Sequence, residues 1–138
     1  MTVTRILALD YGRRRIGVAV SDATGCIAQG LPTIICRNQK QAMNDLVDLI
    51  NSYNVCKVIV GLPLNLKGQK AHAAKEVEQF IQRLERRIEA PIETWDERLT
   101  SLAAERAMIQ MGKSPSKHKH KVDEIAAVLL LQSYLDRG

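Results

Sequence analysis

Two apolar runs near the start of the chain, residues 6–9 and 16–20, constrain the fold more than any other feature of the sequence. A short polar segment that contains Gly12 separates them, and two β-rich runs joined in this way predict a β-hairpin. Asp10 stands where the first predicted strand meets the turn. Its carboxylate can therefore lie clear of the core at an end or edge of a sheet, where it is suited to bind a metal ion or to act as a base.

Hydrophobic periodicity beyond the hairpin predicts further strands and helices. Pro32 lacks a backbone donor, so its strand is expected to lie at the sheet edge or to carry a bulge. Asn54 is expected to end the first helix. The expected elements are a strand at 26–36, a helix at 39–53, a strand at 55–60, a helix at 71–88, a strand at 92–95, a helix at 100–111, a basic solvated loop at 113–121 and an apolar helix at 122–135. This order predicts one α/β domain over residues 1–138, with a mixed sheet and helices on its faces.

Composition narrows the class of protein. Of the 138 residues, 46% are hydrophobic and 25% are charged, which is typical of a globular domain and excludes a disordered chain. The net charge of +5 favours acidic partners such as nucleic acid. Cys26, Cys36 and Cys56 form no CxxC pair, so we expect three buried free thiols in a reducing compartment. No apolar run is long enough to span a membrane, and the early charges argue against a signal peptide, so a cytoplasmic protein is expected.

Three acids fall at comparable places in the expected fold. Asp10 ends the first strand, Glu97 follows the fifth strand, and Asp123 lies in the first turn of the last helix. Ligands gather outside the carboxyl ends of strands in a covered sheet, so these acids could face one cleft. Oxygen ligands without Cys or His favour Mg²⁺ or Mn²⁺, and two such ions are a standard device for cleaving phosphodiesters.

Each acid also has a structural interpretation that the residues alone leave open. Asp10 could serve the turn, Glu97 could form a surface ion pair with Arg98, and Asp123 could interact with the helix dipole.

Four segments in this order, LALDYGRRRIGVAVSD, VIVGLPLNLKG, WDERLTS and KVDEIAAVLLLQSYL, resemble the YqgF family. Its members are bacterial, RuvX-like proteins described as pre-16S rRNA nucleases and also as Holliday junction resolvases. The resemblance implies a ribonuclease H-like fold, a five-stranded mixed sheet in which the first three strands are antiparallel. It also implies that Asp10, Glu97 and Asp123 are the catalytic acids and bind Mg²⁺ or Mn²⁺. Related RuvC-type resolvases carry a further acid where this chain has Ala126, which argues against junction resolution of that kind.

Basic and amide side chains near these motifs are candidate substrate ligands. Strand alternation prevents all three arginines at 13–15 from pointing the same way, so one or two of them are expected to contact phosphates. A basic loop just before Asp123 is suited to clamp a phosphate backbone, although charge runs are also simply solvated. Asn65 could contact substrate or cap a turn. The candidate substrate-binding residues are Arg13, Arg15, Asn65, Lys117, Lys119 and Lys121.

The sequence therefore predicts a Mg²⁺-dependent nuclease that acts on structured RNA. The resemblance points to maturation of the 5′ end of pre-16S ribosomal RNA, with ribosomal particles as possible partners and no membrane partner. Three alternatives remain: a resolvase that acts on branched DNA, a non-catalytic RNA or transcription-associated binder, and an ATPase with an actin-like hairpin. The apolar last helix permits either a monomer or a homodimer.

Overall fold

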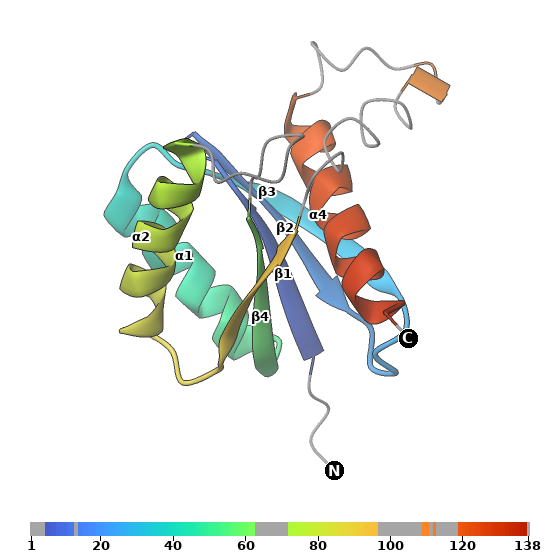
Figure 1. Ribbon diagram of the computed structural model, residues 1–138, viewed down its shortest axis with the longest axis horizontal. Coiled ribbons are helices and arrows are strands. Elements are labelled where there is room, and N and C mark those ends of the chain that lie inside the picture. Colours follow the sequence, from blue (N-terminus) through green and yellow to red (C-terminus); the bar gives the residue numbers. More distant parts are fainter. Residues whose placement is uncertain are drawn as a thin grey trace.

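The computed structural model describes residues 5–12, 14–62, 72–96, 109–110, 112 and 119–137. Five strands form one mixed sheet in the order β3-β2-β1-β4-β5 (Figure 1). Their bounds are β1 Arg5–Tyr11, β2 Arg15–Ser21, β3 Ala28–Ile35, β4 Val55–Leu62 and β5 Ile92–Asp96. The first three strands are antiparallel, and β4 and β5 run parallel to β1. This topology confirms the sheet predicted from the sequence.

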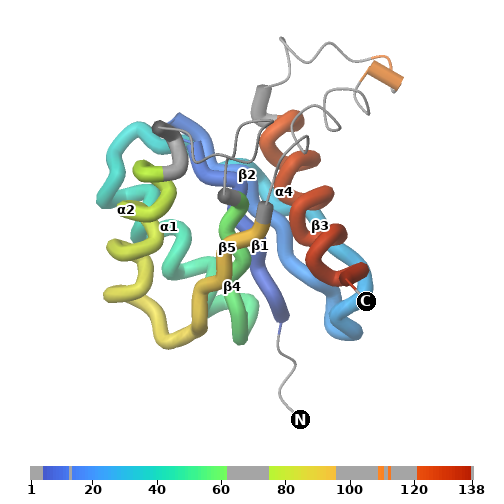
Figure 2. Tube along the Cα trace, viewed as in Figure 1, coloured from blue at the N-terminus to red at the C-terminus, as the bar shows by residue number. Residues whose placement is uncertain are grey.

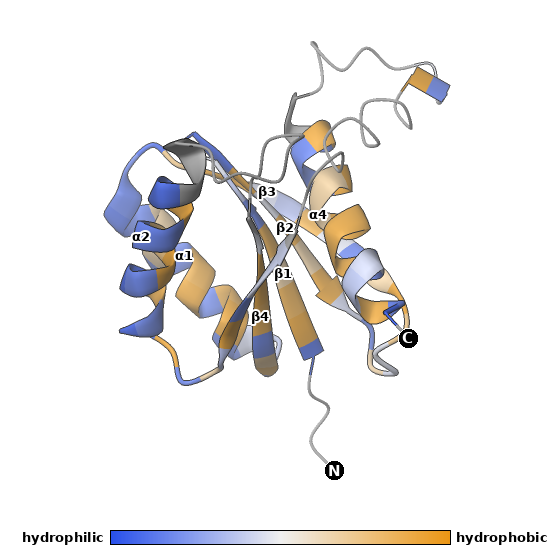
Figure 3. Ribbon diagram, in the orientation of Figure 1, coloured by the Kyte–Doolittle hydropathy of each residue, from blue (hydrophilic) through white to orange (hydrophobic). Residues whose placement is uncertain are grey.

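Helices cover the sheet on both faces (Figure 1, Figure 2). α1 (Gln39–Ser52) and α2 (His72–Glu85) pack on one face against a core that includes Leu7, Leu9, Val58 and Val60. α4 (Lys119–Leu135) packs on the other face, over Ala8, Ala19 and Ile59. Figure 3 shows that α4 is largely hydrophobic, whereas the outer side of α2 is hydrophilic. Among the described residues, no helix has the length and apolar character that a bilayer span requires.

The edge strand β3 carries the irregularity that Pro32 predicts. Ile16 pairs with Ile34 and Val18 pairs with Leu31, so Pro32 and Thr33 together face Gly17 alone. Two residues opposite one are a β-bulge, which bends the strand and leaves a backbone position without its ladder partner. Proline, which has no N–H to donate, is tolerated there.

Helix ends follow local chemistry. The Asn38 side chain accepts hydrogen bonds from the backbone N–H groups of Lys40 and Gln41 and so caps α1. Asn54 follows that helix with φ of 52°, the left-handed conformation that commonly ends helices, as predicted.

Three expectations differ from the structure. α4 begins at Lys119, so the last three residues of the expected loop at 113–121 are helical. Apolar periodicity could not locate this first turn because its residues are all polar. Cys26 and Cys56 are exposed and Cys36 is half-buried, so the expectation of three buried thiols is wrong, although all three are free. Cys26 lies in the turn between β2 and β3, and Cys56 lies at the beginning of β4, near the ends of the sheet. The expected helix at 100–111 falls almost wholly outside the described residues.

Candidate active site where β1 meets the last helix

Asp10 is half-buried near the end of β1 and lies on the face of the sheet that α4 covers. Side chains alternate along a strand, and Ala8, two residues earlier, packs against Ala127, Leu130 and Leu131 of α4. Tyr11, the next residue, packs with the core on the opposite face. The Asp10 carboxylate at this end of β1 therefore faces the same side of the sheet as α4.

The beginning of α4 approaches Asp10 by crossing β2 at Gly17. Gly17 is the partner of Asp10 in the antiparallel pair of β1 and β2. A Cβ on Gly17 would collide with the carbonyl oxygen of Asp123 and would lie 2.7 Å from its carbonyl carbon. Facing Cα atoms in an antiparallel pair are about 5 Å apart, so the Cα atoms of Asp10 and Asp123 lie within roughly 10 Å of each other. The structure thus brings two of the three predicted acids together.

Arg15 binds the second of these acids directly. Its Nε donates to Oδ2 of Asp123 at 2.6 Å, and the exposed fractions of the two side chains are 30% and 21%. Side chains alternate between the two faces along a strand, so Arg15 and Gly17, two positions apart in β2, both face α4. The sequence predicted a phosphate ligand at Arg15, and in the structure this guanidinium orients Asp123. Arg14, its exposed neighbour, accepts a hydrogen bond at its backbone oxygen from the Cys36 N–H.

The remaining candidates are placed only in part. Arg13, Asn65, Glu97 and Lys117 lie outside the described residues. Lys119 begins α4, but its side chain is not among those described. Lys121 is exposed, and its Nζ donates to Glu124 at 3.2 Å.

The third predicted acid follows a strand that reaches the same edge of the sheet. β4 lies between β1 and β5, and all three are parallel, so their carboxyl ends share one edge. β5 ends at Asp96, one residue before Glu97. Within the part of the chain that the structure describes, no three His, Cys, Asp or Glu side chains form a group that could hold a metal ion.

The two acids that are described suit a hard cation. Both are carboxylates, the oxygen ligands that Mg²⁺ and Mn²⁺ prefer. Oδ2 of Asp123 already binds the positive charge of Arg15, which shows that this position of the fold accommodates a cation beside the carboxylate.

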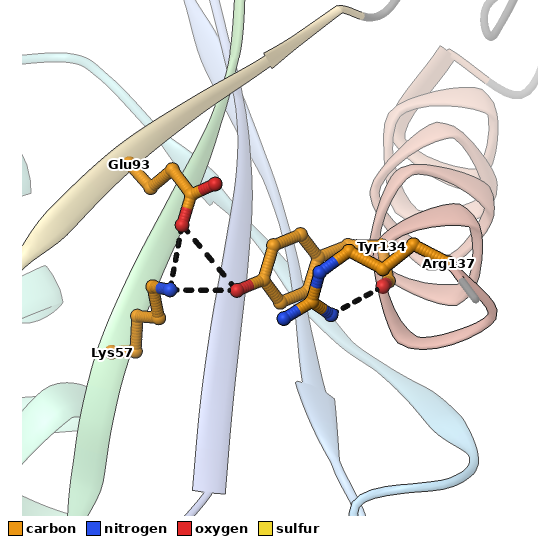
Figure 4. Close-up of polar contacts among 4 residues, drawn as sticks. All are labelled: Lys57, Glu93, Tyr134 and Arg137. Atoms are coloured by element: carbon orange, nitrogen blue, oxygen red, sulfur yellow. Dashed lines mark hydrogen bonds and ion pairs between the residues drawn. The ribbon is translucent and has the colours of Figure 1, made fainter.

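The far end of α4 is fixed by a cluster that sequence reasoning missed (Figure 4). The Tyr134 ring is 1% exposed, and its hydroxyl accepts from Lys57 Nζ at 2.7 Å. Lys57 also pairs with Glu93 at 2.6 Å, and Glu93 lies 3.4 Å from the same hydroxyl. The Arg137 guanidinium stacks 3.7 Å from the ring centroid, and its Nη1 donates to the Tyr134 carbonyl at 2.7 Å. Trp95 packs against Tyr134 in a T-shaped arrangement, with ring centroids 5.2 Å apart.

Electrostatics within this cluster favour the charged forms. The hydrogen bond to Glu93, and then that to Tyr134, raises the pKa of Lys57, and the hydrogen bond from Lys57 lowers the pKa of Glu93. A lysine inside the otherwise apolar run VCKVIV was the signal that could have revealed the cluster. α4 is therefore fixed at two points, at Tyr134 near its end and at Asp123, whose backbone contacts Gly17 of β2. Because an α-helix is a rigid element that rises 1.5 Å per residue, these two contacts determine the position of Asp123.

Comparison with known proteins agrees with this fold. A family model described as "RuvX: Holliday junction resolvase" matches residues 4–137. A protein of Desulforamulus reducens named "Putative pre-16S rRNA nuclease" is 42% identical over 134 residues, which are 97% of this chain and 98% of the relative. A Clostridium tetani protein of the same name is 46% identical over 132 residues, 96% of each chain.

Two solved structures show the same fold at low sequence identity. A complex of the fowlpox virus resolvase with Holliday junction DNA has a TM-score of 0.57 at 17% identity and covers 96% of this chain and 97% of that chain. T. thermophilus RuvC with a Holliday junction has a TM-score of 0.56 at 14% identity and covers 96% of each chain. These likenesses confirm the expected ribonuclease H-like fold.

Proposed function

The chain belongs to the RuvX family, and from this premise we propose that it is a nuclease that hydrolyses phosphodiester bonds in structured RNA. The name shared by its relatives points to precursor 16S ribosomal RNA as the substrate. The resemblance of the sequence to the YqgF family adds cleavage at the 5′ end. The single observation that carries the proposal is the approach of Asp123 to Asp10 across Gly17. Two carboxylates held on rigid elements at one strand end suit phosphodiester hydrolysis better than any other chemistry of this fold.

Asp10, Asp123 and Glu97 would hold Mg²⁺ or Mn²⁺ at this edge of the sheet. Such ions, when bound, neutralise charge on the phosphate under attack and steady the leaving oxygen. Asp10 contributes a carboxylate fixed by a central strand, and Arg15 orients the carboxylate of Asp123 through its 2.6 Å hydrogen bond. Lys119 and Lys121, at the start of α4, would attract the phosphate backbone toward these acids.

Branched DNA is the second candidate substrate, because the family model carries the description of a junction resolvase. The position three residues after Asp123 argues against it. Ala126 is 1% exposed and packs in the interface between α4 and the sheet, so this helix supplies no further carboxylate there. A resolvase would also present two sites at once, as a dimer on the junction.

A cleavage assay separates these possibilities. Purified protein with Mg²⁺ is incubated with labelled precursor 16S RNA or with a four-way DNA junction of matched length. Wild type is compared with Asp10→Asn and with the control Asp48→Asn, which makes the same chemical change at an exposed site on α1. We expect RNA cleavage by wild type and Asp48→Asn and none by Asp10→Asn. Equal cleavage by wild type and Asp10→Asn would refute the proposal, and preferential cleavage of the junction would replace RNA by DNA.

A further inference from the structure

A basic groove lies on the helical face of the molecule, on the side of the sheet opposite α4. It runs between the beginning of α1 and the end of α2 and has a volume of about 500 Å³. Its lining residues are Gln39, Lys40, Met43, Arg83, Arg86 and Arg87. None of these residues belongs to the candidate active site, and no motif of the sequence drew attention to them.

The groove is strongly positive because four of its six lining residues are cations and none is an acid. All four cations are exposed, and no carboxylate of the described part of the chain forms an ion pair with them. The Arg87 guanidinium is held in place by a 3.0 Å hydrogen bond to Asn44 of α1. The acids nearest in sequence are Glu85 and Glu89, and both are exposed. Glu85 lies two residues after Arg83 and so on another side of α2, and neither acid forms an ion pair with a groove cation among the described residues.

A second, smaller hollow connects this groove with the end of β1. It shares Gln39, Met43 and Arg83 with the groove and extends to Tyr11, which directly follows Asp10. The Tyr11 ring stacks on Phe80 of α2 with centroids 4.3 Å apart. The lining residues of the two hollows therefore extend from Tyr11, the residue after Asp10 in β1, along the α1 and α2 face of the sheet to the arginines.

We propose that this groove binds the phosphate backbone of the nucleic acid outside the segment that is cut. The inference rests on the proposed function for the identity of the substrate. Arginine presents a planar fork of donors that matches a phosphate, so three arginines and a lysine without acids among them favour a polyanion over a protein surface of mixed charge. Such contacts add affinity and position the strand without reading its sequence.

Basic residues near the end of a helix can instead stabilise that helix through its dipole, and this alternative makes a different prediction. It predicts that removing the arginines lowers the melting temperature and leaves binding unchanged. The phosphate-binding proposal predicts that removing the arginines weakens binding and leaves the melting temperature unchanged.

The test uses Arg83→Gln with Arg86→Gln, which spares the tethered Arg87. Arg83→Lys with Arg86→Lys retains the charge, and Lys75→Gln removes an exposed cation from the other end of α2. Binding of labelled precursor RNA is measured by fluorescence anisotropy in an Asp10→Asn background between 50 and 200 mM salt. Log affinity falls with log salt, and losing two phosphate contacts should make this slope shallower by about 1.4–1.8. Binding should also weaken roughly tenfold. The lysine pair should keep most of the slope, and Lys75→Gln should behave as the parent.

Cleavage kinetics provide a second measurement with intact Asp10. For a long RNA that reaches the groove, the glutamine pair should raise KM and leave kcat unchanged, whereas a short RNA around the cut should show no change. An unchanged salt slope with a normal KM would overturn the groove proposal and leave the nuclease proposal standing. If the parent binds neither RNA nor junction DNA, both proposals fail. If the double variant does not fold, Arg86→Gln alone should lower the slope by about half as much.

Discussion

Replacing Gly17 by alanine tests the closest approach between α4 and the sheet. The added Cβ would lie 2.7 Å from the carbonyl carbon of Asp123, whereas ordinary contact begins at 3.4 Å, and it would collide with the carbonyl oxygen. The obstructing atoms are backbone, so no side chain can rotate away. The beginning of α4 must move outward, and Asp123 must move with it. Asp123 was expected in the first turn of this helix, but it is the fifth residue because α4 begins at Lys119.

The expected cost follows from this geometry. Overpacking costs about 1–3 kcal/mol, and the better strand propensity of alanine returns roughly 0.5–1 kcal/mol. A net loss of about 1–2 kcal/mol lowers the melting temperature of a domain of this size by roughly 4–8 °C. Displacement of a catalytic group by about 1 Å can reduce the rate by about 100-fold. We therefore expect Gly17→Ala to lose more activity than its stability alone explains.

Gly30→Ala is the matched control. Its Cβ would meet Oε1 and Cγ of Glu124 at 2.6 and 2.8 Å, but these atoms belong to a flexible, half-buried side chain that can turn aside. The expected change in stability is about 0.5 kcal/mol or less. Both variants are melted by circular dichroism and assayed on precursor RNA well below their melting temperatures. If Gly17→Ala has the stability and the cleavage rate of wild type, the close crossing of α4 over β2 at Gly17 does not position Asp123.

Three further predictions concern the contacts that seat α4. Tyr134→Phe removes the hydroxyl that binds Lys57 and should lower the free energy of unfolding by about 0.5–1.5 kcal/mol in urea titrations, with no loss of secondary structure. The pKa of Glu93 is lowered, so its contribution to the free energy of unfolding should be present above pH 4.5 and should disappear as the pH falls through the pKa of the folded state. The pKa of Lys57 is raised, so its contribution should be present below pH 10.5 and should disappear as the pH rises through the pKa of the folded state. Melting curves of wild type and of Lys57→Met with Glu93→Gln should therefore differ by a constant amount between those limits, and a difference that varies near pH 7 would contradict the assignment. Arg15→Gln removes the guanidinium that orients Asp123 and should weaken the stabilisation of the protein by Mn²⁺ in thermal shifts, whereas stronger stabilisation would show that Arg15 mainly competes with the metal for the carboxylate.

Much of the fold could be predicted because its signals are local. Two apolar runs around a Gly-containing turn were enough to predict the hairpin of β1 and β2. Pro32 indicated an edge strand or a bulge, and β3 has both. The resemblance of four ordered segments supplied what periodicity cannot, a five-stranded mixed sheet whose first three strands are antiparallel. The structure adds that β4 pairs parallel to β1 and β5 parallel to β4. The first turn of α4 was missed because polar residues carry no periodic signal.

The sequence named the candidate acids of the site, but it did not predict how α4 and the sheet bring two of them together. Ala126 and Ala127 are buried where α4 packs against the sheet, because their small side chains let the helix lie close to the strands. The closest approach, however, is at Gly17, because a residue without Cβ on β2 admits the helix backbone itself. The pairing of Arg15 with Asp123 and of Lys57 with Tyr134 joins residues far apart in the chain, so no local pattern could show it.

The seating of α4 has a consequence for when the protein can act. Arg15 and Asp123 are 108 positions apart, so the strands of the hairpin leave the ribosome long before the helix that completes their site. Domains acquire structure from the N-terminal side during synthesis, and contacts of such long range form late. Until α4 has been made, the face of the sheet that bears Ala8, Ala19 and Ile59 lacks the cover of this helix, and Asp10 lacks the carboxylate of Asp123 beside it. A chain still in synthesis therefore cannot cut RNA through this site, and the order of translation itself delays the activity until the helix is in place.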